Sequence, residues 1–242
     1  MAYSHGSDAA IHVNGYNLGP FLNSVTPAAT ADTAEVSTFG DNAKEYIGGL
    51  VDATVSAEGF FSGATGESDA ILNAALGVSG TLWSVFPQGD TLGNIGYGMS
   101  CIHTTYDAPA NMTDAVRVSV SAQVSGGRER GKSHHALSAE TAAGNSATID
   151  NGASSALGGV SYVHVTAFSG TSITPKIQHS TDDSVWADLI THAAVSAANS
   201  KERKTTAALT TTVNRYTRGA WTGTFTTETF SLLFSRAPYT LS

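Results

Sequence analysis

The sequence predicts a nearly all-β protein with one short helix, and three observations support this class. Glycine is frequent, with 25 residues, and charged residues make up only 13% of the chain. This composition is typical of sheet proteins with many turns. Polar and apolar side chains alternate over long stretches, as on strands with one buried face. Only one segment has helical spacing, and 242 residues suffice for two domains that each bury a core.

The clearest pattern lies in residues 32–63. Two strands, 32–39 and 50–61, flank a turn-rich and charged loop at 40–49. In the second strand small apolar residues alternate with polar ones, so we expect one face in a core and the other toward water or a polar partner. The polar side chains of that strand are Asp52, Thr54, Ser56 and Glu58. Strands of this length often pair between subunits as well as within one.

The other elements follow from turn signals. Residues 11–31 predict two short strands joined by an Asn14-Gly15 turn, with Pro20 and Pro27 at an edge or at bends. A helix is expected over 68–76, capped by Ser68 and ended by Gly77. The remaining expected strands are 81–86, 96–105, 114–124, 159–169, 172–180, 215–222 and 226–236. The last four suggest an antiparallel sandwich.

The segment GGRERGKSHH, residues 126–135, breaks the strand pattern with glycines and basic side chains. It predicts a linker at 128–135, between a first domain of residues 1–127 and a second domain of residues 136–242. His134 and His135 are expected to be solvated in this linker. Adjacent residues on a strand would face opposite sides, so they form no shared metal site without a turn and other ligands.

Charge is unevenly distributed along the chain, whose net charge is −8. Residues 1–132 contain five Lys or Arg against thirteen Asp or Glu, whereas residues 133–242 contain seven of each. The first half therefore carries the whole net charge. An acidic surface repels nucleic-acid phosphates, which disfavours DNA binding and lets DNA pass without adhering.

One motif matches a pattern that is typical of nucleotide-binding proteins. Gly126, Gly131, Lys132 and Ser133 match the phosphate-loop pattern G-x-x-x-x-G-K-[ST]. Such a loop needs a following helix and a parallel sheet, whereas its neighbours here predict antiparallel strands. Coincidence in a charged linker is therefore favoured. No catalytic, cofactor-binding or metal-binding residues are predicted, and the chain is not expected to be an enzyme.

Two single residues carry alternatives. Cys101 excludes an internal disulfide, and a lone thiol in a strand is usually a small core residue. Trp186, beside the turn at Asp182 and Asp183, could stack on a sugar; the favoured alternative is that it anchors the sandwich core. The N-terminus lacks a secretory pattern and no stretch approaches the ~20 apolar residues of a membrane span, so synthesis in a cytoplasm is expected.

Five segments in order resemble the major tail tube protein of long, non-contractile-tailed bacteriophages (siphophages). They are VNGYNLG (13–19), DTAEVSTFGDNAKEYIGGLVDATVSAEGFF (32–61), SDAILNAALG (68–77), TLWSVFPQGD (81–90) and DAVRVSVSAQVSGG (114–127). The resemblance covers about residues 8–127, and its most specific part lies between Thr38 and Phe60. The second half is similar to sandwich modules that decorate phage tails, and residues 179–189 resemble galactose-binding jelly rolls.

The resemblance implies a tail-tube-type β-barrel or sandwich domain followed by an antiparallel β-sandwich of immunoglobulin-like or jelly-roll type. It implies a structural virion protein of the phage tail, made in the bacterial host cytoplasm, whose six-membered rings stack into the tube that carries DNA. The implied partners are copies of itself and the tape measure, tail terminator and tail tip proteins. DNA would pass transiently without specific binding, and no membrane or cofactor is involved.

Two sets of residues follow from joining the resemblance to the strand pattern. Asp52, Thr54, Ser56 and Glu58 are expected to face the lumen. The ring-stacking loop is expected to use Asp41, Lys44, Glu45 and Tyr46. The alternative function is a carbohydrate-binding or adhesion protein, whose second domain binds host-surface glycans through Trp186. A nucleotide-binding enzyme is the third alternative.

Overall fold

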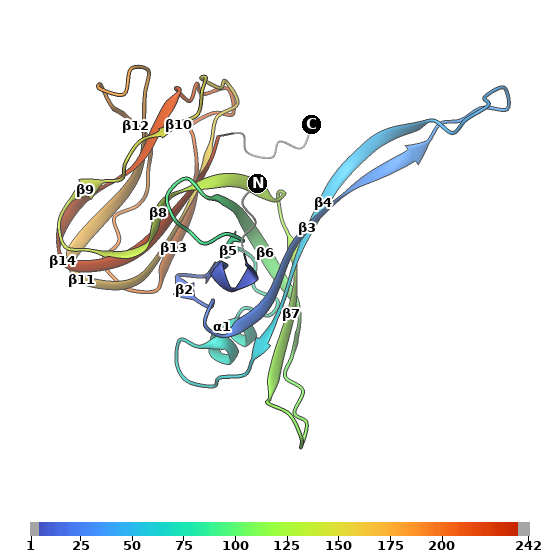
Figure 1. Cartoon of the computed structure of the whole chain (residues 1–242), viewed down its shortest axis with the longest axis horizontal. Helices are drawn as coiled ribbons and strands as arrows, with labels where there is room; N and C mark the ends of the chain where they lie inside the picture. The colour runs from blue at the N-terminus through green and yellow to red at the C-terminus, as the bar shows by residue number, and fades with distance from the viewer. Residues whose placement is uncertain (1–4, 237–242) are drawn as a thin grey trace.

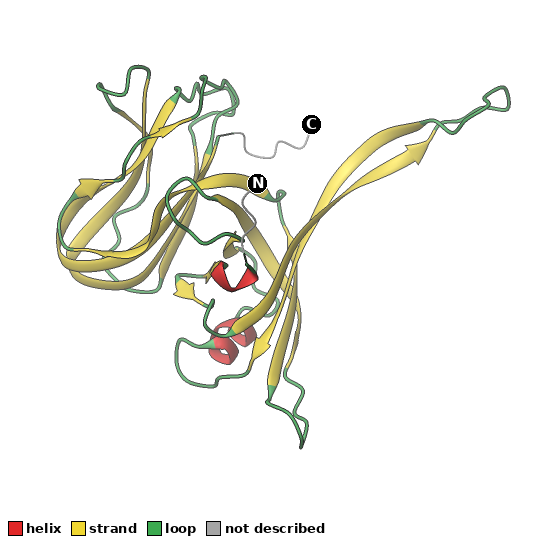
Figure 2. Cartoon of the chain, in the orientation of Figure 1, coloured by secondary structure: helices red, strands yellow, loops and turns green. Residues whose placement is uncertain are grey.

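The computed structural model describes residues 5–236, which form one continuous antiparallel sheet curled around apolar cores (Figure 1, Figure 2). The chain is thus nearly all-β, as predicted. Its elements in order are η1 (Gly6–Asp8), β1 (Ala10–Val13), β2 (Tyr16–Asn17), β3 (Leu22–Glu35), β4 (Tyr46–Phe60), α1 (Ser68–Ala74), β5 (Thr81–Phe86), β6 (Ile95–Asp107), β7 (Arg117–Val124), β8 (Glu129–Glu140), β9 (Gly144–Asn145), β10 (Ile149–Asp150), β11 (Val160–Ser180), β12 (Ala187–Thr191), β13 (Ser200–Thr205) and β14 (Tyr216–Ser235).

The first half forms a curved sheet in the order β2-β1-β5-β6-β7-β4-β3. Its concave side holds a core to which α1 adds the fully buried Leu72. On β4 the alternation predicts the facing correctly, because Ala53, Val55 and Ala57 are buried while the residues between them are exposed. The predicted Asn14-Gly15 turn is also confirmed: both residues have positive φ and connect β1 to β2.

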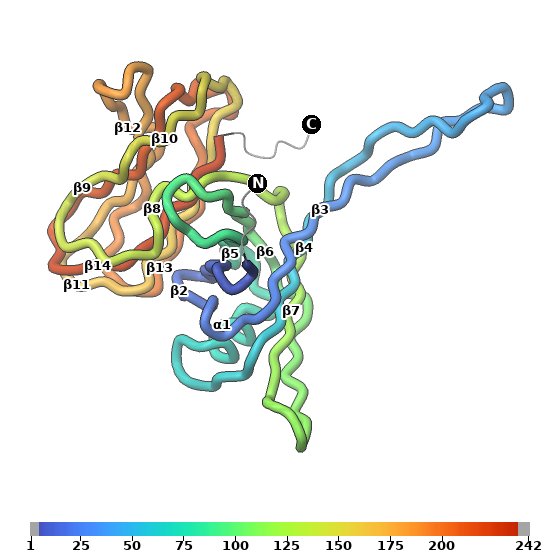
Figure 3. Tube along the Cα trace, in the orientation of Figure 1, coloured from blue at the N-terminus to red at the C-terminus, as the bar shows by residue number. Residues whose placement is uncertain are grey.

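The predicted linker at 128–135 is wrong, because strand β8 runs through it. β8 pairs with β6 over Glu129–Lys132 and with β14 from Lys132 to Glu140, so the sheet passes from the first half into the second without a break. Its basic residues alternate with buried ones, and Gly131 lies against β14 where a Cβ would come within 2.4 Å of the Phe234 carbonyl oxygen. His134 and His135 are buried rather than solvated. In Figure 3 the trace of β8 runs from the first half of the chain into the second.

The second half is built on two very long strands, β11 and β14, which pair along nearly their whole length. The sequence predicts each as two separate strands. Gly170 and Gly223 interrupt the pattern, yet the chain bends there instead of reversing. Both have φ near +150°, and a Cβ on Gly223 would come within 2.2 Å of the Ser172 carbonyl oxygen. The bend brings both parts of each strand around one core (Figure 1).

The two halves also share a buried junction. Leu82 and Phe86 of β5 pack against Val160 and Tyr162 of β11 and Leu233 of β14. Polar side chains also connect the halves: His12 Nδ1 of β1 lies 2.8 Å from Ser231 Oγ of β14, and His164 Nε2 of β11 lies 3.0 Å from Ser84 Oγ of β5. The halves are therefore joined by an apolar cluster and hydrogen bonds as well as by the sheet.

Candidate functional site

The convex face of the β3-β4-β7-β6 sheet is polar. Asp52, Thr54, Ser56 and Glu58 are exposed on β4, as the alternation predicts. Their neighbours in register are also polar or small: Ser56 lies between Thr26 and Ser121, and Glu58 lies between Ser24 and Ser119. Helix α1 and the second half lie on the opposite side of this sheet in Figure 1. The four predicted residues thus share one continuous outward surface.

The electrostatics of this face are acidic. Asp52 accepts hydrogen bonds from the Gln123 side chain and from the Ala53 amide, and Glu58 points outward. In the part of the chain that the structure describes, neither carboxylate forms an ion pair. Arg117 lies at one end of the face, over the Phe60 ring. A ligand approaching the middle of the face meets carboxylates and hydroxyls.

A long hairpin arm projects from this sheet (Figure 1). We define the arm as residues 31–50, the outer parts of β3 and β4 with their loop. All its side chains are exposed except that of Ser37, which is half-buried. Large apolar side chains are among them, and Phe39 is fully exposed. They are Val36, Phe39, Tyr46, Ile47 and Leu50. Exposed apolar groups gathered on one projection are typical of a protein–protein contact.

The tip of the arm has a defined conformation. Asp41 accepts hydrogen bonds from the Thr38 amide at 2.6 Å and from the Thr38 hydroxyl at 3.0 Å, and these bonds lower the pKa of Asp41. Lys44 forms an ion pair with Glu35 at 2.8 Å. Of the four predicted contact residues, Asp41 and Lys44 therefore shape the loop itself, while Glu45 and Tyr46 present their side chains to solvent.

A second hairpin projects from the other end of the same sheet, between β6 and β7 (Figure 1). Its residues lie between the predicted strands 96–105 and 114–124. Met112 at its tip is fully exposed, and Val116 is exposed at its base. Pro109 and Asn111 are typical turn residues, but nothing local shows how far the hairpin projects. The sheet thus ends in two exposed hairpins that point in opposite directions.

Two edges of the sheet have free backbone groups. Among the described strands β3 pairs only with β4, although Arg128 donates a hydrogen bond to the Pro27 carbonyl at 2.6 Å. The end of β6, from Ile102 to Asp107, pairs with β7 on one side. On the other side it has a single bridge, from His103 to Leu76, and within residues 5–236 no further strand pairing. Free edges are sites at which another chain can add a strand.

The phosphate-loop motif, Cys101 and Trp186, which the sequence analysis weighed for other functions, do not form a common site. Lys132 and Ser133 lie within β8, which continues as a strand to Glu140 where a phosphate loop would begin a helix, so the phosphate-loop geometry is absent. Burial raises the pKa of the Cys101 thiol to about 12, which keeps it protonated and unreactive. Trp186 is half-buried, so the favoured prediction that it anchors the core is wrong. The Arg218 guanidinium lies 4.2 Å from the centroid of its ring. The core tryptophans are Trp83 and Trp221.

One buried cluster has the geometry of a catalytic triad. His192 Nδ1 lies 2.9 Å from Glu202 Oε2, and His192 Nε2 lies 2.9 Å from Ser161 Oγ. Ser161 is completely buried on β11, however, and it lines neither of the two hollows described below. A nucleophile must reach its substrate. The cluster therefore connects β11 to the segment after β12 and to β13.

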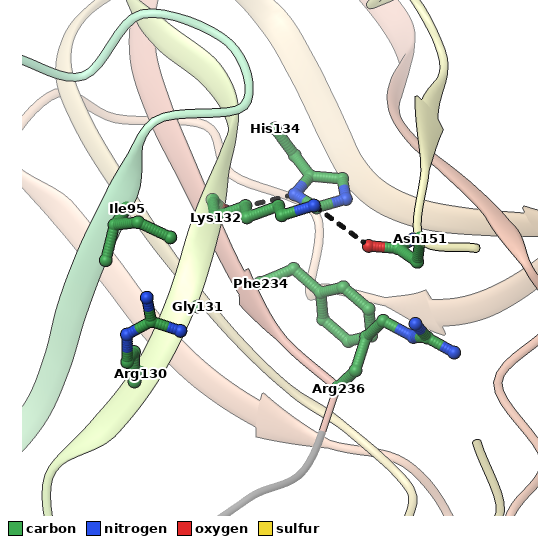
Figure 4. A pocket seen from close by; sticks show the side chains of 8 residues that line it. All are labelled: Ile95, Arg130, Gly131, Lys132, His134, Asn151, Phe234 and Arg236. Carbon is green, nitrogen blue, oxygen red and sulfur yellow. Dashed lines mark hydrogen bonds between the residues drawn. The ribbon is translucent and has the colours of Figure 1, made fainter. Parts of the chain in front are cut away.

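Two hollows lie elsewhere among the described residues. The larger, of about 610 Å³, lies at the seam between the start of β3 and β1, and Ile11, Leu22 and Val25 contribute to its walls. The smaller, of about 120 Å³, lies where β8 meets the end of β14 (Figure 4). No group of three or more residues able to hold a metal is found in residues 5–236. No helix in that range is long and apolar enough to cross a membrane.

Fold and site together define a nearly all-β protein with an acidic sheet face and exposed contact elements. No protein-family model matches the sequence, and no curated protein matches it significantly. Among solved structures, the virion of a native gene transfer agent particle aligns over 53% of this chain and 98% of its own, with 16% identity and a TM-score of 0.42. The SPP1 tail tube aligns over 53% of this chain and 78% of its own, with 15% identity and a TM-score of 0.41. The SPP1 Dit protein, described as a paradigm of hub adsorption apparatus in Gram-positive infecting phages, aligns over 92% of this chain and 98% of its own, with 8% identity and a TM-score of 0.37.

Proposed function

We propose that this chain is a structural subunit of a siphophage tail tube and that it assembles with copies of itself. The observation that carries the proposal is the arm at residues 31–50, whose apolar side chains have no partner within the described part of the chain. A two-stranded ribbon without a packed face is marginal by itself. Contact with a second copy would bury these side chains and give the arm its function.

The free edges support a lateral contact in the same assembly. If the edge of β3 in one copy pairs with the end of β6 in the next, the four-stranded sheets join side by side into a closed wall. A contact between two different surfaces closes into a ring when the rotation allows it. In this proposal the ring has six members, as the sequence resemblance implies.

The polar face would then form the inner wall. Asp52, Thr54, Ser56 and Glu58 would repeat around a lumen, where acidic side chains repel phosphates and let DNA slide. The arm would stack one ring on the next through Asp41, Lys44, Glu45 and Tyr46, with the apolar residues of the arm alongside. Stacking of this kind does not close and extends into a tube.

The second half would project outward from the tube wall, because it lies on the side of the sheet opposite the polar face (Figure 1). In this proposal the ends of the tube contact the tape measure, terminator and tip proteins. A glycan contact at Trp186 stays a prediction. Since Arg218 lies over its ring, a sugar could stack only on the other face.

Electron microscopy of the purified full chain tests the proposal. We expect wild-type protein to form hollow tubes or rings. The variant Phe39→Ser/Ile47→Ser should stay folded, because both side chains are exposed, but should remain monomeric. The matched control Val185→Ser/Leu209→Ser removes two exposed apolar side chains from the second half and should assemble normally. Normal tubes from the arm variant, or a wild-type protein that stays monomeric at all concentrations, would reject the proposal.

A further inference from the structure

The first half exposes a second group of large apolar side chains, at the end of the sheet opposite the arm (Figure 1). We call this group the far-end patch, and it consists of Phe60, Phe61, Met112 and Val116. Phe60 ends β4, and the Phe61 amide donates a hydrogen bond at 3.0 Å to the Val116 carbonyl at the base of the β6–β7 hairpin. The patch is therefore formed by two neighbouring segments of the sheet.

The far-end patch is not covered by the rest of the described chain. Each of its four side chains is at least 39% exposed. The Arg117 guanidinium lies 5.6 Å from the centroid of the Phe60 ring, yet that ring remains 44% exposed. Apolar groups gathered on an exposed surface are typical of a contact with another protein.

The charge around the patch and on the arm restricts the kind of partner. Residues 31–50 of the arm contain one Lys and four Asp or Glu, and residues 107–117 contain one Arg and two Asp. Lys44 and Arg117, the cations of these segments, already form ion pairs within the chain. Nucleic acids and acidic lipid surfaces are bound through excess positive charge, which both segments lack. The partner of each is therefore an apolar protein surface.

The arm and the far-end patch are connected by one strand. β4 begins within the arm at Tyr46 and ends in the patch at Phe60. A second copy displaced along β4 brings its patch toward the arm of the first copy. The arm has reach for this contact, because the five strand residues on each of its legs extend about 16 Å before its loop begins. The same displacement can be repeated, so a contact between these two different surfaces extends without closing.

We propose that the far-end patch is the surface on which the arm of the next copy docks. In this contact Phe39 and Ile47 of one copy pack against Phe61, Met112 and Val116 of the next. The inference rests on the proposed assembly and identifies the second surface of its stacking contact. A contact between two arms would instead leave the patch of every copy exposed.

Two variants, each altered on one side of the contact, test this inference by mixing. Phe39→Ser/Ile47→Ser alters the arm, and Met112→Ser/Val116→Ser alters the patch. Both should stay folded, because all four side chains are exposed, and each alone should stay monomeric. An equimolar mixture should form a complex, because the intact arm of one variant fits the intact patch of the other. The complex should not extend into tubes, since its free arm and free patch are the altered ones; sedimentation velocity measures both outcomes.

Crosslinking within assembled tubes locates the contact. Cys101, the single cysteine of the chain, is buried, and burial raises the pKa of its thiol to about 12, so it does not react. Tubes of Phe39→Cys/Met112→Cys treated with a short bis-maleimide should give a ladder of linked copies on a denaturing gel. Phe39→Cys/Val185→Cys, with its second thiol at an exposed position of the other half, should give no ladder.

The outcomes separate this inference from the proposed assembly. If wild-type tubes form but the mixed variants do not associate, or the Phe39→Cys/Met112→Cys tubes give no ladder, the docking surface is wrong and the assembly stands. Linked dimers from Phe39→Cys alone would show that arms contact arms, which also overturns the inference. A wild type that stays monomeric at all concentrations overturns both.

Discussion

Histidine side chains form several of the buried hydrogen bonds of the fold. His134 donates from Nδ1 to the Lys132 carbonyl at 3.0 Å, and its Nε2 accepts from the Thr217 hydroxyl at 2.9 Å. His103 bonds in the same way to the Leu72 carbonyl and to the Trp83 indole. These bonds require the neutral ring. Burial disfavours the charged ring, and it lowers the pKa of His12 and His134 to about 4 and that of His164 well below its ordinary value.

The lowered pKa values predict acid sensitivity. Each of these histidines binds a proton more readily in the unfolded chain, from about pH 6.5 downward, than in the folded one. Their stabilising effect is therefore complete above pH 6.5 and is lost as pH falls toward 4. Burial raises the pKa of Glu228 to about 8, and this group favours the folded state as pH falls. Its effect is smaller than the combined effect of the three histidines. We expect the free energy of unfolding to be at least about 3 kcal/mol lower at pH 4.5 than at pH 7.

Urea unfolding of the full chain at the two pH values measures this difference. His134→Gln should show a smaller difference than the wild type, because one titrating group is gone. His5→Gln is the matched control, since His5 is exposed. Equal stability of the wild type at pH 7 and pH 4.5 would contradict the assignment of neutral buried histidines.

The β4 strand shows how one element combines a core face with an outer face. Val55 is 1% exposed, whereas Ser56 beside it is exposed. Asp at position 55 would place a carboxyl group among apolar side chains, so Val55→Asp should destabilise the fold by about 3 kcal/mol or more. Ser56→Asp adds the same group on the other face and should change stability by no more than about 0.5 kcal/mol. Urea unfolding of both variants checks the facing, and similar losses would show that it is wrong.

The alternation of apolar and polar residues explains why β4 and β7 could be predicted from the sequence and β8 could not. Val118, Val120 and Ala122 alternate with polar residues, which is a local signal of one buried face. In β8 the buried positions include Glu129, Gly131 and Ser133. Glu129 is buried beside Arg203, a partner far away in the chain. Polar residues buried by distant partners leave no local hydrophobic pattern.

At the scale of the whole molecule, the acidic first half predicts how assembled tubes treat DNA. Thr54→Lys/Ser56→Lys adds two positive charges to the proposed inner wall. Tubes of this variant should bind DNA at least tenfold more tightly than wild-type tubes at about 50 mM salt, with the difference shrinking at about 200 mM salt. The bound DNA should resist nuclease, because it would lie inside the tube.

The control for this prediction is Thr181→Lys/Ser184→Lys, which adds the same charge to exposed positions of the second half. DNA bound to those tubes should remain open to nuclease. If the control protects DNA and the β4 variant does not, the polar face lies on the outside of the tube and the proposed orientation is wrong.

The sequence by itself determined the all-β class, the two faces of β4, the Asn14-Gly15 turn and the location of the acidic charge. All of these depend on residues close together in the chain. Only the tertiary structure decided that β8 replaces the predicted linker, and that Gly170 and Gly223 bend two strands instead of ending them. It also decided that the arm projects without a partner in the described part of the chain. These features depend on which strands pair across long stretches of sequence. The spacing of hydrophobic residues and the composition of turns contain no information about such pairing.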